Sequence, residues 1–149
     1  MQRSGRWRVW SDLAKPCFGV TLASNKAEGA MADRLKGKVA IVSGGATGCG
    51  AAAVRLFAAE GAAVGIIDRN VQAGQALAFE LASQGKRVVF ATADVSQKDQ
   101  VEAAVANVKA SLGPVNVLFN HAGTIVIKPF LETEEEDWDF LFDVNVKSM

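Results

Sequence analysis

Three glycines in residues 44–50 carry the clearest chemical signal of the chain. Gly44, Gly48 and Gly50 have the spacing G-x-x-x-G-x-G and follow the apolar run 39–42. A turn without Cβ atoms, placed between a buried strand and a helix, lets a phosphate approach the backbone closely. The free N–H groups and the positive dipole end of the following helix then face the phosphate. The spacing predicts a dinucleotide-binding turn, and a tight strand–helix turn without a ligand is the alternative.

An acidic residue, Asp68, ends the next apolar run. A carboxylate at this position accepts hydrogen bonds from the adenosine ribose hydroxyls and repels a 2′-phosphate, which favours NAD over NADP. Arg69 acts in the opposite direction, because a guanidinium can hold a 2′-phosphate. Asp68 occupies the more direct position, so we expect NAD to be the preferred cofactor. The alternative is that Asp68 caps the next helix, a role that Asn70 could fill instead.

Apolar runs and helical periods alternate along the chain from Lys38 onward. The apolar runs are short, rich in β-branched residues and apolar on both faces, which is typical of parallel strands covered on both sides. We expect strands at 39–42, 63–67, 88–91 and 115–119, and helices at 48–60, 70–83, 97–112 and from Thr133 to the chain end. Ser96 is the expected N-cap of the third helix, and Thr133 with Glu136 the expected capping box of the fourth. This alternation predicts an α/β fold with a doubly wound parallel sheet.

Composition indicates one globular domain and gives no case for nucleic acid or membrane partners. The 149 residues are 50% hydrophobic and 21% charged, and the formal net charge is zero. No apolar run approaches the roughly 20 residues that span a bilayer. The two cysteines, Cys17 and Cys49, do not make a disulfide framework, which favours a reducing, cytoplasmic location. No cluster of residues predicts a metal site.

The first 34 residues are expected to be a disordered segment outside the domain, which then covers 35–149. Residues 1–30 contain five Lys or Arg and two Asp or Glu. A basic, serine-containing leader is typical of an organelle transit peptide. We favour a start codon assigned too early, with Met31 as the true start, because the residues from Met31 are a natural opening to the first strand.

Four ordered segments resemble the short-chain dehydrogenase/reductase family over residues 35–149. Residues 43–50, Ser-Gly-Gly-Ala-Thr-Gly-Cys-Gly, resemble the family's Thr-Gly-x-x-x-Gly-x-Gly turn. Ala93-Asp94-Val95 resembles the pair that contacts adenine, and Asn120-His121-Ala122-Gly123 resembles Asn-Asn-Ala-Gly. Val144-Asn145-Val146-Lys147 resembles the segment with the catalytic asparagine. Together they are far more specific than any one of them.

The resemblance assigns roles to individual residues. Asn145 would hold a water in a proton relay, although a satisfied structural asparagine on an apolar helix face is the alternative. The residues implied to bind NAD(P) are Ser43, Gly44, Thr47, Gly48, Cys49, Gly50, Asp68, Arg69, Asp94, Val95, Asn120, Ala122 and Gly123.

Three positions depart from the family pattern. Ser43 replaces threonine and keeps the hydroxyl, and Cys49 replaces a branched aliphatic residue and is expected only to pack. His121 replaces an asparagine and is the single histidine. We do not expect His121 to be catalytic, because no candidate nucleophile or metal-ligand cluster accompanies it.

The catalytic Tyr-x-x-x-Lys motif of the family has no counterpart, since the sequence contains no tyrosine. In the family, hydride passes between the nicotinamide and an alcohol or carbonyl carbon. The resemblance therefore implies the N-terminal part of a longer, homo-oligomeric oxidoreductase that acts on a small molecule of unknown identity. Its incomplete Rossmann-type sheet would have four strands in the order 3-2-1-4. We expect an uncovered fourth strand, exposed Trp138, Leu141 and Phe142, and a poorly soluble, inactive chain.

Two other classes of function compete with this interpretation. One is a non-catalytic dinucleotide-binding module. The other is a different nucleotide-using α/β enzyme, such as a methyltransferase, although the three-residue gap between Gly44 and Gly48 argues against it. A P-loop NTPase is excluded because no Gly-Lys-Ser/Thr follows the glycines.

Overall fold

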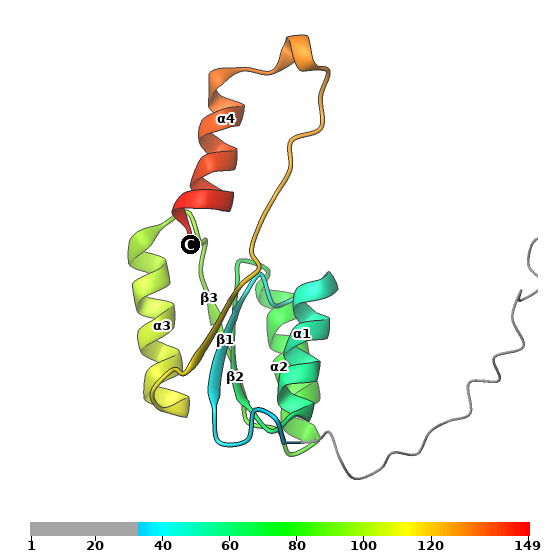
Figure 1. The fold of residues 1–149 in the computed structure, drawn as a ribbon, viewed down its shortest axis with the longest axis vertical. Coiled ribbons are helices and arrows are strands. Elements are labelled where there is room, and N and C mark those ends of the chain that lie inside the picture. The colour runs from blue at the N-terminus through cyan, green and yellow to red at the C-terminus, as the bar shows by residue number, and fades with distance from the viewer. Residues whose placement is uncertain (1–32) are drawn as a thin grey trace, which may run out of the picture. The chain divides into compact units, whose positions relative to one another are not determined.

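Four parallel strands form one sheet in the spatial order β3-β2-β1-β4 in a computed structural model that describes residues 33–149 (Figure 1). The strands are β1 (Val39–Ser43), β2 (Ala63–Asp68), β3 (Val88–Thr92) and β4 (Val117–Asn120). β1 pairs with β2 on one side and with β4 on the other. The strand order matches the expectation, and the strand bounds differ from the expected ones by at most two residues.

The connecting helices are α1 (Gly48–Ala59), α2 (Val71–Ser83) and α3 (Lys98–Leu112), close to the predicted ranges. Asn70 caps α2, since its side chain accepts a hydrogen bond from the Ala73 N–H at 3.1 Å. The predicted Ser96 cap of α3 is wrong. Gln97 is the N-cap residue, and the Ser96 hydroxyl donates to the Asp94 carboxylate instead. The Asp94 carboxylate accepts from both the N–H and the hydroxyl of Ser96, which holds Ser96 in the turn before the helix.

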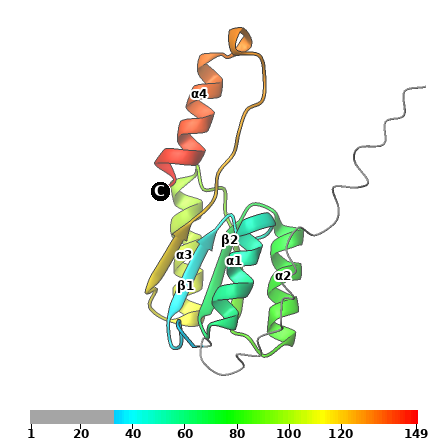
Figure 2. The ribbon, with the colours of Figure 1, turned by 45° about the vertical axis from the view of Figure 1, so that its right-hand side comes forward.

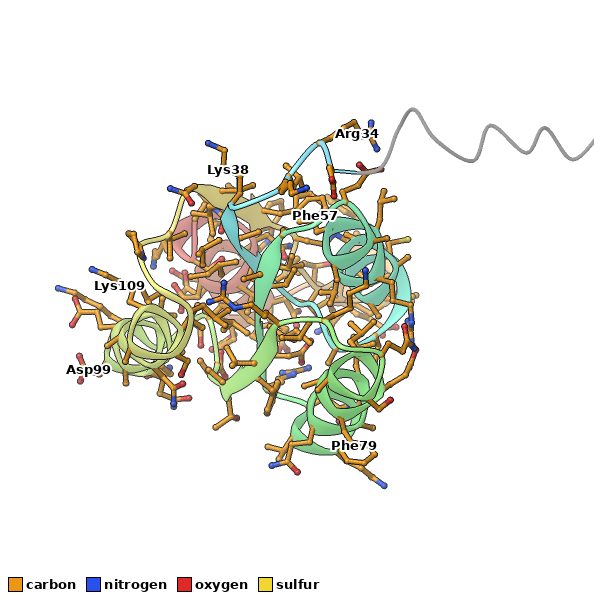
Figure 3. All side chains as sticks on the ribbon, turned by 90° about the horizontal axis from the view of Figure 1, so that it is seen from below. Arg34, Lys38, Phe57, Phe79, Asp99 and Lys109 are labelled. Atoms are coloured by element: carbon orange, nitrogen blue, oxygen red, sulfur yellow. The ribbon has the colours of Figure 1, made fainter. Side chains whose placement is uncertain are left out.

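The helices cover both faces of the sheet, as Figure 3 shows with α1 and α2 on one side and α3 on the other. Alternate strand residues point to opposite faces, so Val42 and Val64 pack under α1 and α2, while Ile41 and Ile67 pack under α3. Each face is an apolar layer of Val, Ile, Leu and Ala side chains. The doubly wound arrangement is therefore confirmed, and it places the carboxyl ends of the strands side by side.

After β4 the chain runs away from the sheet, turns at a short 3₁₀ helix (η1, Phe130–Glu132), and returns as α4 (Glu135–Phe142) (Figures 1 and 2). A π-helical turn (η2, Asp143–Lys147) follows α4. The predicted capping box is one residue out of register: the N-cap is Glu134, whose N–H donates to the Asp137 carboxylate at 2.9 Å.

The apolar surface expected around β4 and α4 is present. Leu118 on β4 is 59% exposed and Trp138 on α4 is 54% exposed, and Phe142 is also exposed. Leu141 is half-buried, so its predicted exposure is only partial. Within the structure, β4 pairs with β1 alone and presents an open edge.

The predicted leader lies outside the described residues except for its last two. Arg34 donates from its guanidinium to the Glu60 carboxylate at 2.9 Å, so this residue belongs to the domain. No helix in residues 33–149 is long and apolar enough to cross a membrane.

Candidate nucleotide-binding site

A cleft of about 470 Å³ opens at the carboxyl edge of the sheet. The strand order reverses between β1 and β4, and this is where open α/β sheets bind their ligands. The cleft is lined by the turn after β1, by the residues that follow the other three strands, and by η2. Its lining residues are Gly44, Thr47, Gly48, Cys49, Asp68, Arg69, Asn70, Ala93, Asp94, Val95, His121, Ala122, Gly123 and Val144.

Gly44, Gly48 and Gly50, three of the four glycines in residues 44–50, lack a side chain for different reasons. A Cβ on Gly44, which has φ of +64°, would lie 2.8 Å from the Ala122 Cα. A Cβ on Gly50 would lie 2.0 Å from the Gly44 carbonyl oxygen. Only Gly48, with φ of +54°, would direct a Cβ into open space, and it lines the cleft. The sequence analysis explained all three glycines by the close approach of a phosphate. That explanation fits Gly48, whereas Gly44 and Gly50 are required by packing within the protein.

The first turn of α1 presents its backbone N–H groups to the cleft. Thr47 is the N-cap residue, and its side chain makes no capping hydrogen bond. The first N–H groups of an α-helix have no partner within the helix, so an anion can accept from them. Thr47, Gly48 and Cys49 all line the cleft at this point.

Asp68 joins the end of β2 to the glycine turn. One carboxylate oxygen accepts from the Ala46 N–H and the other from the Asn70 N–H, both at 2.9 Å. A carboxylate has about four lone-pair sites, so both oxygens can still accept a further hydrogen bond. Asp68 therefore positions the turn and presents acceptors to the cleft, and Asn70, not Asp68, caps α2.

Asp94 lies at the end of β3 with a fixed, ionised carboxylate. It accepts from the Ser96 hydroxyl at 2.7 Å and from the Ser96 N–H at 2.9 Å. The two hydrogen bonds lower the pKa of Asp94 below its usual value, against the opposing effect of partial burial, and the Arg69 charge also lowers it. The edge of the cleft after β2 and β3 thus carries two carboxylates and one guanidinium.

Ser43, Gly50 and Asn120 are the predicted cofactor-binding residues that do not line the cleft. The Ser43 hydroxyl oxygen is buried and accepts from the backbone N–H groups of His121 and Ala122, at 3.1 and 3.2 Å. Ser43 therefore holds the loop after β4 in place. Asn120 is exposed at the end of β4.

Asn145 is half-buried and bonded on both sides of its amide. Its Oδ1 accepts from the Thr124 N–H at 2.8 Å, and its Nδ2 donates to the Thr124 carbonyl at 2.9 Å. The residue therefore fastens η2 to the loop after β4, while its neighbour Val144 lines the cleft. The bonding matches the structural alternative, and the catalytic role of Asn145 stays a prediction.

Four lining residues were not predicted to bind the cofactor: Asn70, Ala93, His121 and Val144. Each directly follows or precedes a predicted residue, so extending each motif by one position would have included them. His121 was noted as a departure from the family pattern, and the structure now places it in the cleft. Its ring stacks on Phe119 with centroids 5.4 Å apart and an interplanar angle of 24°.

The parallel sheet and the cleft at its strand-order reversal define a nucleotide-binding α/β domain. The model of the short chain dehydrogenase family matches residues 38–149, and the chain belongs to this family. A cyclopentanol dehydrogenase of Comamonas sp. is 35% identical over 116 residues, which cover 78% of this chain and 46% of that protein. A 3-beta-hydroxysteroid dehydrogenase of Comamonas testosteroni is 43% identical over 120 residues, covering 80% and 46%.

Solved structures of the family share the fold. The L-sorbose reductase of Gluconobacter frateurii, complexed with NADPH and L-sorbose, has a TM-score of 0.72 and 33% identity. The match covers 79% of this chain and 44% of that one. The chain thus spans about half the length of the relatives that it matches.

Proposed function

We propose that the cleft binds NAD(P) and that the chain is the cofactor-binding part of an NAD(P)-dependent oxidoreductase. The observation that carries this proposal is the convergence of the uncapped start of α1, Gly48, Asp68 and Asp94 on one cleft. The open space at Gly48 and the free N–H groups of α1 fit a pyrophosphate. Family membership and the names of the relatives support hydride transfer to or from a small-molecule alcohol or carbonyl.

The proposed contacts follow the order of the strands. Thr47, Gly48 and Cys49 bind the pyrophosphate through the start of α1, and Asp68 and Arg69 face the adenosine ribose. Asp94 and Val95, after β3, lie against the adenine, and Ala122 and Gly123 contact the cofactor from the loop after β4. Ser43 and Gly50 act from outside the cleft, where Ser43 holds the loop after β4 and Gly50 allows the tight turn. Asn120, also outside the cleft, is the last residue of β4 before that loop.

We propose NAD as the preferred cofactor, although the related L-sorbose reductase was solved with NADPH. The Asp68 carboxylate faces the cleft, and ribose hydroxyls can donate to its remaining lone pairs. A 2′-phosphate in the same place would meet the charge of Asp68 and, from the next strand, that of Asp94. Arg69 would attract a 2′-phosphate, but its single positive charge is set against the two negative charges of Asp68 and Asp94.

Calorimetric titration of the full chain with NAD⁺ and NADP⁺ tests both parts of this proposal. We expect NAD⁺ to bind at least about tenfold more tightly, a difference of about 1.4 kcal/mol. Asp68→Asn, which removes the charge at nearly constant size, should reduce this preference. Asp99→Asn, in the first turn of α3, is the matched control because Asp99 does not line the cleft, and it should leave the preference unchanged. Tighter binding of NADP⁺ would contradict the NAD preference, and no binding of either nucleotide would contradict the proposed site.

We further propose that this chain alone binds the cofactor without catalysing hydride transfer. General acid–base catalysis needs a titrating group within hydrogen-bond reach of the substrate oxygen. In the family that group is a tyrosine, and the 149 residues contain none. This is also the observation that favours the second candidate function, a non-catalytic dinucleotide-binding module. NADH formation by the purified chain with NAD⁺ and a panel of secondary alcohols would contradict this. The substrate, the homo-oligomeric state and the cytoplasmic location stay predictions.

A further inference from the structure

A second cleft, of about 430 Å³, opens at the amino edge of the sheet, where the four strands begin. This is the edge opposite the candidate nucleotide-binding site, and Figure 3 looks onto it with Lys38 labelled. The two clefts have no lining residue in common. The amino-edge cleft is lined by Gly37, Lys38, Val39, Ala58, Gly61, Ala62, Ala63, Gly85, Lys86, Arg87, Leu112, Pro114 and Asn116.

The charged residues that line the amino-edge cleft are all positive. They are Lys38, Lys86 and Arg87, and no Asp or Glu of the described chain lines it. None of the three forms an ion pair with a carboxylate of residues 33–149. The carboxylate of Glu60, next to the cleft, already accepts from the guanidinium and the backbone N–H of Arg34. The cleft therefore holds three positive charges without a partner from the described residues.

The start of β2 fixes the spacing of these charges. The Lys38 carbonyl accepts from the Ala63 N–H and the Arg87 carbonyl accepts from the Val64 N–H, both at 2.9 Å. The two basic residues therefore flank β2, with their backbones about 10 Å apart, because neighbouring strands lie about 4.8 Å apart. The long side chains of lysine and arginine can reach a common ligand across this distance.

Two further features provide oriented hydrogen-bond donors. The Asn116 Oδ1 accepts from the Val39 N–H at 3.0 Å, which leaves the Nδ2 of the same amide without an acceptor among residues 33–149. The Arg87 guanidinium donates to the Leu112 carbonyl at 3.2 Å, which fixes its position at the end of α3. A guanidinium has five N–H donors, so the others stay available to a ligand.

The helix ends at this edge account for only part of the positive charge. Helices α1, α2 and α3 all end here, and the C-terminal end of a helix carries about half a negative charge. The three ends together amount to about −1.5 charges, against three full positive charges. A net positive potential therefore remains in the cleft, and it attracts anions.

We propose that the amino-edge cleft binds a small anion of the phosphate class with at least two negative charges. Ammonium and guanidinium groups form charge-assisted hydrogen bonds with phosphate oxygens. The donors come from the segments before β1, β3 and β4, and donors from several directions suit a tetrahedral phosphate better than a planar carboxylate. The proposal does not depend on the proposed function, because the two sites share no residue.

NMR titration of the full chain with inorganic pyrophosphate tests this proposal, with the backbone amides as reporters. Amides of Lys38, Gly85 and Lys86 should shift, and the dissociation constant fitted to them should rise with salt concentration. Pyrophosphate also fits the start of α1, so the amides of Gly48 and Cys49 are fitted separately. Each set of amides then gives the affinity of its own cleft.

Single substitutions test the contribution of each charge. Lys38→Gln and Lys86→Gln should each weaken binding at the amino edge about fivefold or more, which is roughly the Coulomb energy of one exposed ion pair at 4 Å. Lys109→Gln is the matched control, because it removes the same charge from the last turn of α3 outside the cleft. Lys109→Gln should change the affinity by less than about twofold, since salt screens distant charges.

The possible results separate the two sites. Shifts confined to Gly48 and Cys49, or no shift in a folded chain, overturn the amino-edge site. Equal weakening by Lys86→Gln and Lys109→Gln overturns it too, because it indicates general attraction of anions to a charged surface. Binding of pyrophosphate at the amino edge by a chain that binds neither NAD⁺ nor NADP⁺ would support this site and contradict only the proposed function.

Discussion

Gly48→Ala is the substitution that most directly separates a nucleotide site from an ordinary strand–helix turn. An added Cβ would meet no protein atom within 4 Å, so it creates no clash within the protein. The residue has φ of +54°, and a side chain in this left-handed conformation costs about 1–2 kcal/mol of folding free energy. The variant should therefore fold with a small loss of stability. The new methyl group, however, occupies the space where the proposed phosphate approaches the backbone.

The loss of binding can be sized by ligand-induced stabilisation. A ligand at about 100 times its dissociation constant raises the free energy of unfolding by about 2.7 kcal/mol. If Gly48→Ala weakens NAD⁺ binding about tenfold, the same NAD⁺ concentration raises the free energy of unfolding of the variant by only about 1.4 kcal/mol. Urea unfolding with and without NAD⁺ measures both values in one experiment.

Gly85→Ala is the matched control for this experiment. Gly85 has φ of +77°, its Cβ would also meet nothing within 4 Å, and it does not line the cleft. The two variants should lose similar stability without ligand, and only Gly48→Ala should lose the stabilisation by NAD⁺. Equal stabilisation of the two variants by NAD⁺ would refute the assignment of the phosphate site to Gly48.

Three further predictions test the contacts around the cleft. Gly50→Ala should lower the free energy of unfolding by about 3 kcal/mol or more, because its Cβ would lie 2.0 Å from the Gly44 carbonyl oxygen. Urea unfolding measures this loss. A loss below about 1 kcal/mol would show that the turn can shift to accept the methyl group. Asn145→Ala should cost about 1–3 kcal/mol and expose the Thr124 amide to hydrogen exchange. Asn145→Asp keeps the acceptor for that amide but sets an oxygen against the Thr124 carbonyl, so it should protect the amide less than asparagine does. Equal protection in Asn145→Ala and in the natural chain would contradict the clamp. Ser96→Ala should raise the pKa of Asp94 toward its usual value, measured by NMR titration of the carboxyl carbon. The pKa of Asp94 is lower in the folded than in the unfolded chain, where it is near 3.9. The ionised Asp94 therefore stabilises the fold above that unfolded pKa, and this stabilisation is lost as the pH falls through the folded pKa. Ser96→Ala should make the loss of stability smaller.

Local patterns along the sequence were enough to predict the elements of the fold. Each strand contains a short apolar run, rich in β-branched residues in the first three strands. Each of the first three helices buries a face whose residues recur with the helical period. The errors concern the exact position of two helix N-caps, each of which lies one residue after the predicted one. The Ser96 hydroxyl donates to Asp94 instead of capping α3, and the capping box of α4 forms at Glu134 and Asp137, one residue after the predicted pair. Acidic residues adjoin each other there, so the sequence did not specify the register.

Contacts between distant parts of the chain could not be predicted in the same way. Gly44 must lack a side chain because Ala122 lies against its Cα. Asn145 bonds to the backbone of Thr124, in the loop after β4. Neither contact follows from spacing, because each depends on the path of the chain after β4. The sequence predicted the candidate site residues, and the structure separates those that line the cleft from those that hold its wall.

The loop of residues 121–124 forms one wall of the cleft and is held by three residues that are distant from it in the sequence. The Ser43 hydroxyl accepts from the first two N–H groups of the loop, Gly44 allows Ala122 to lie against the turn, and Asn145 binds Thr124 on both sides. Ser43 and Asn145 do not line the cleft, yet they fix the segment that carries His121, Ala122 and Gly123 into it. Their effect on cofactor binding should therefore pass through the position of this loop. This gives the two residues a physical role that depends on neither proton transfer nor contact with the cofactor.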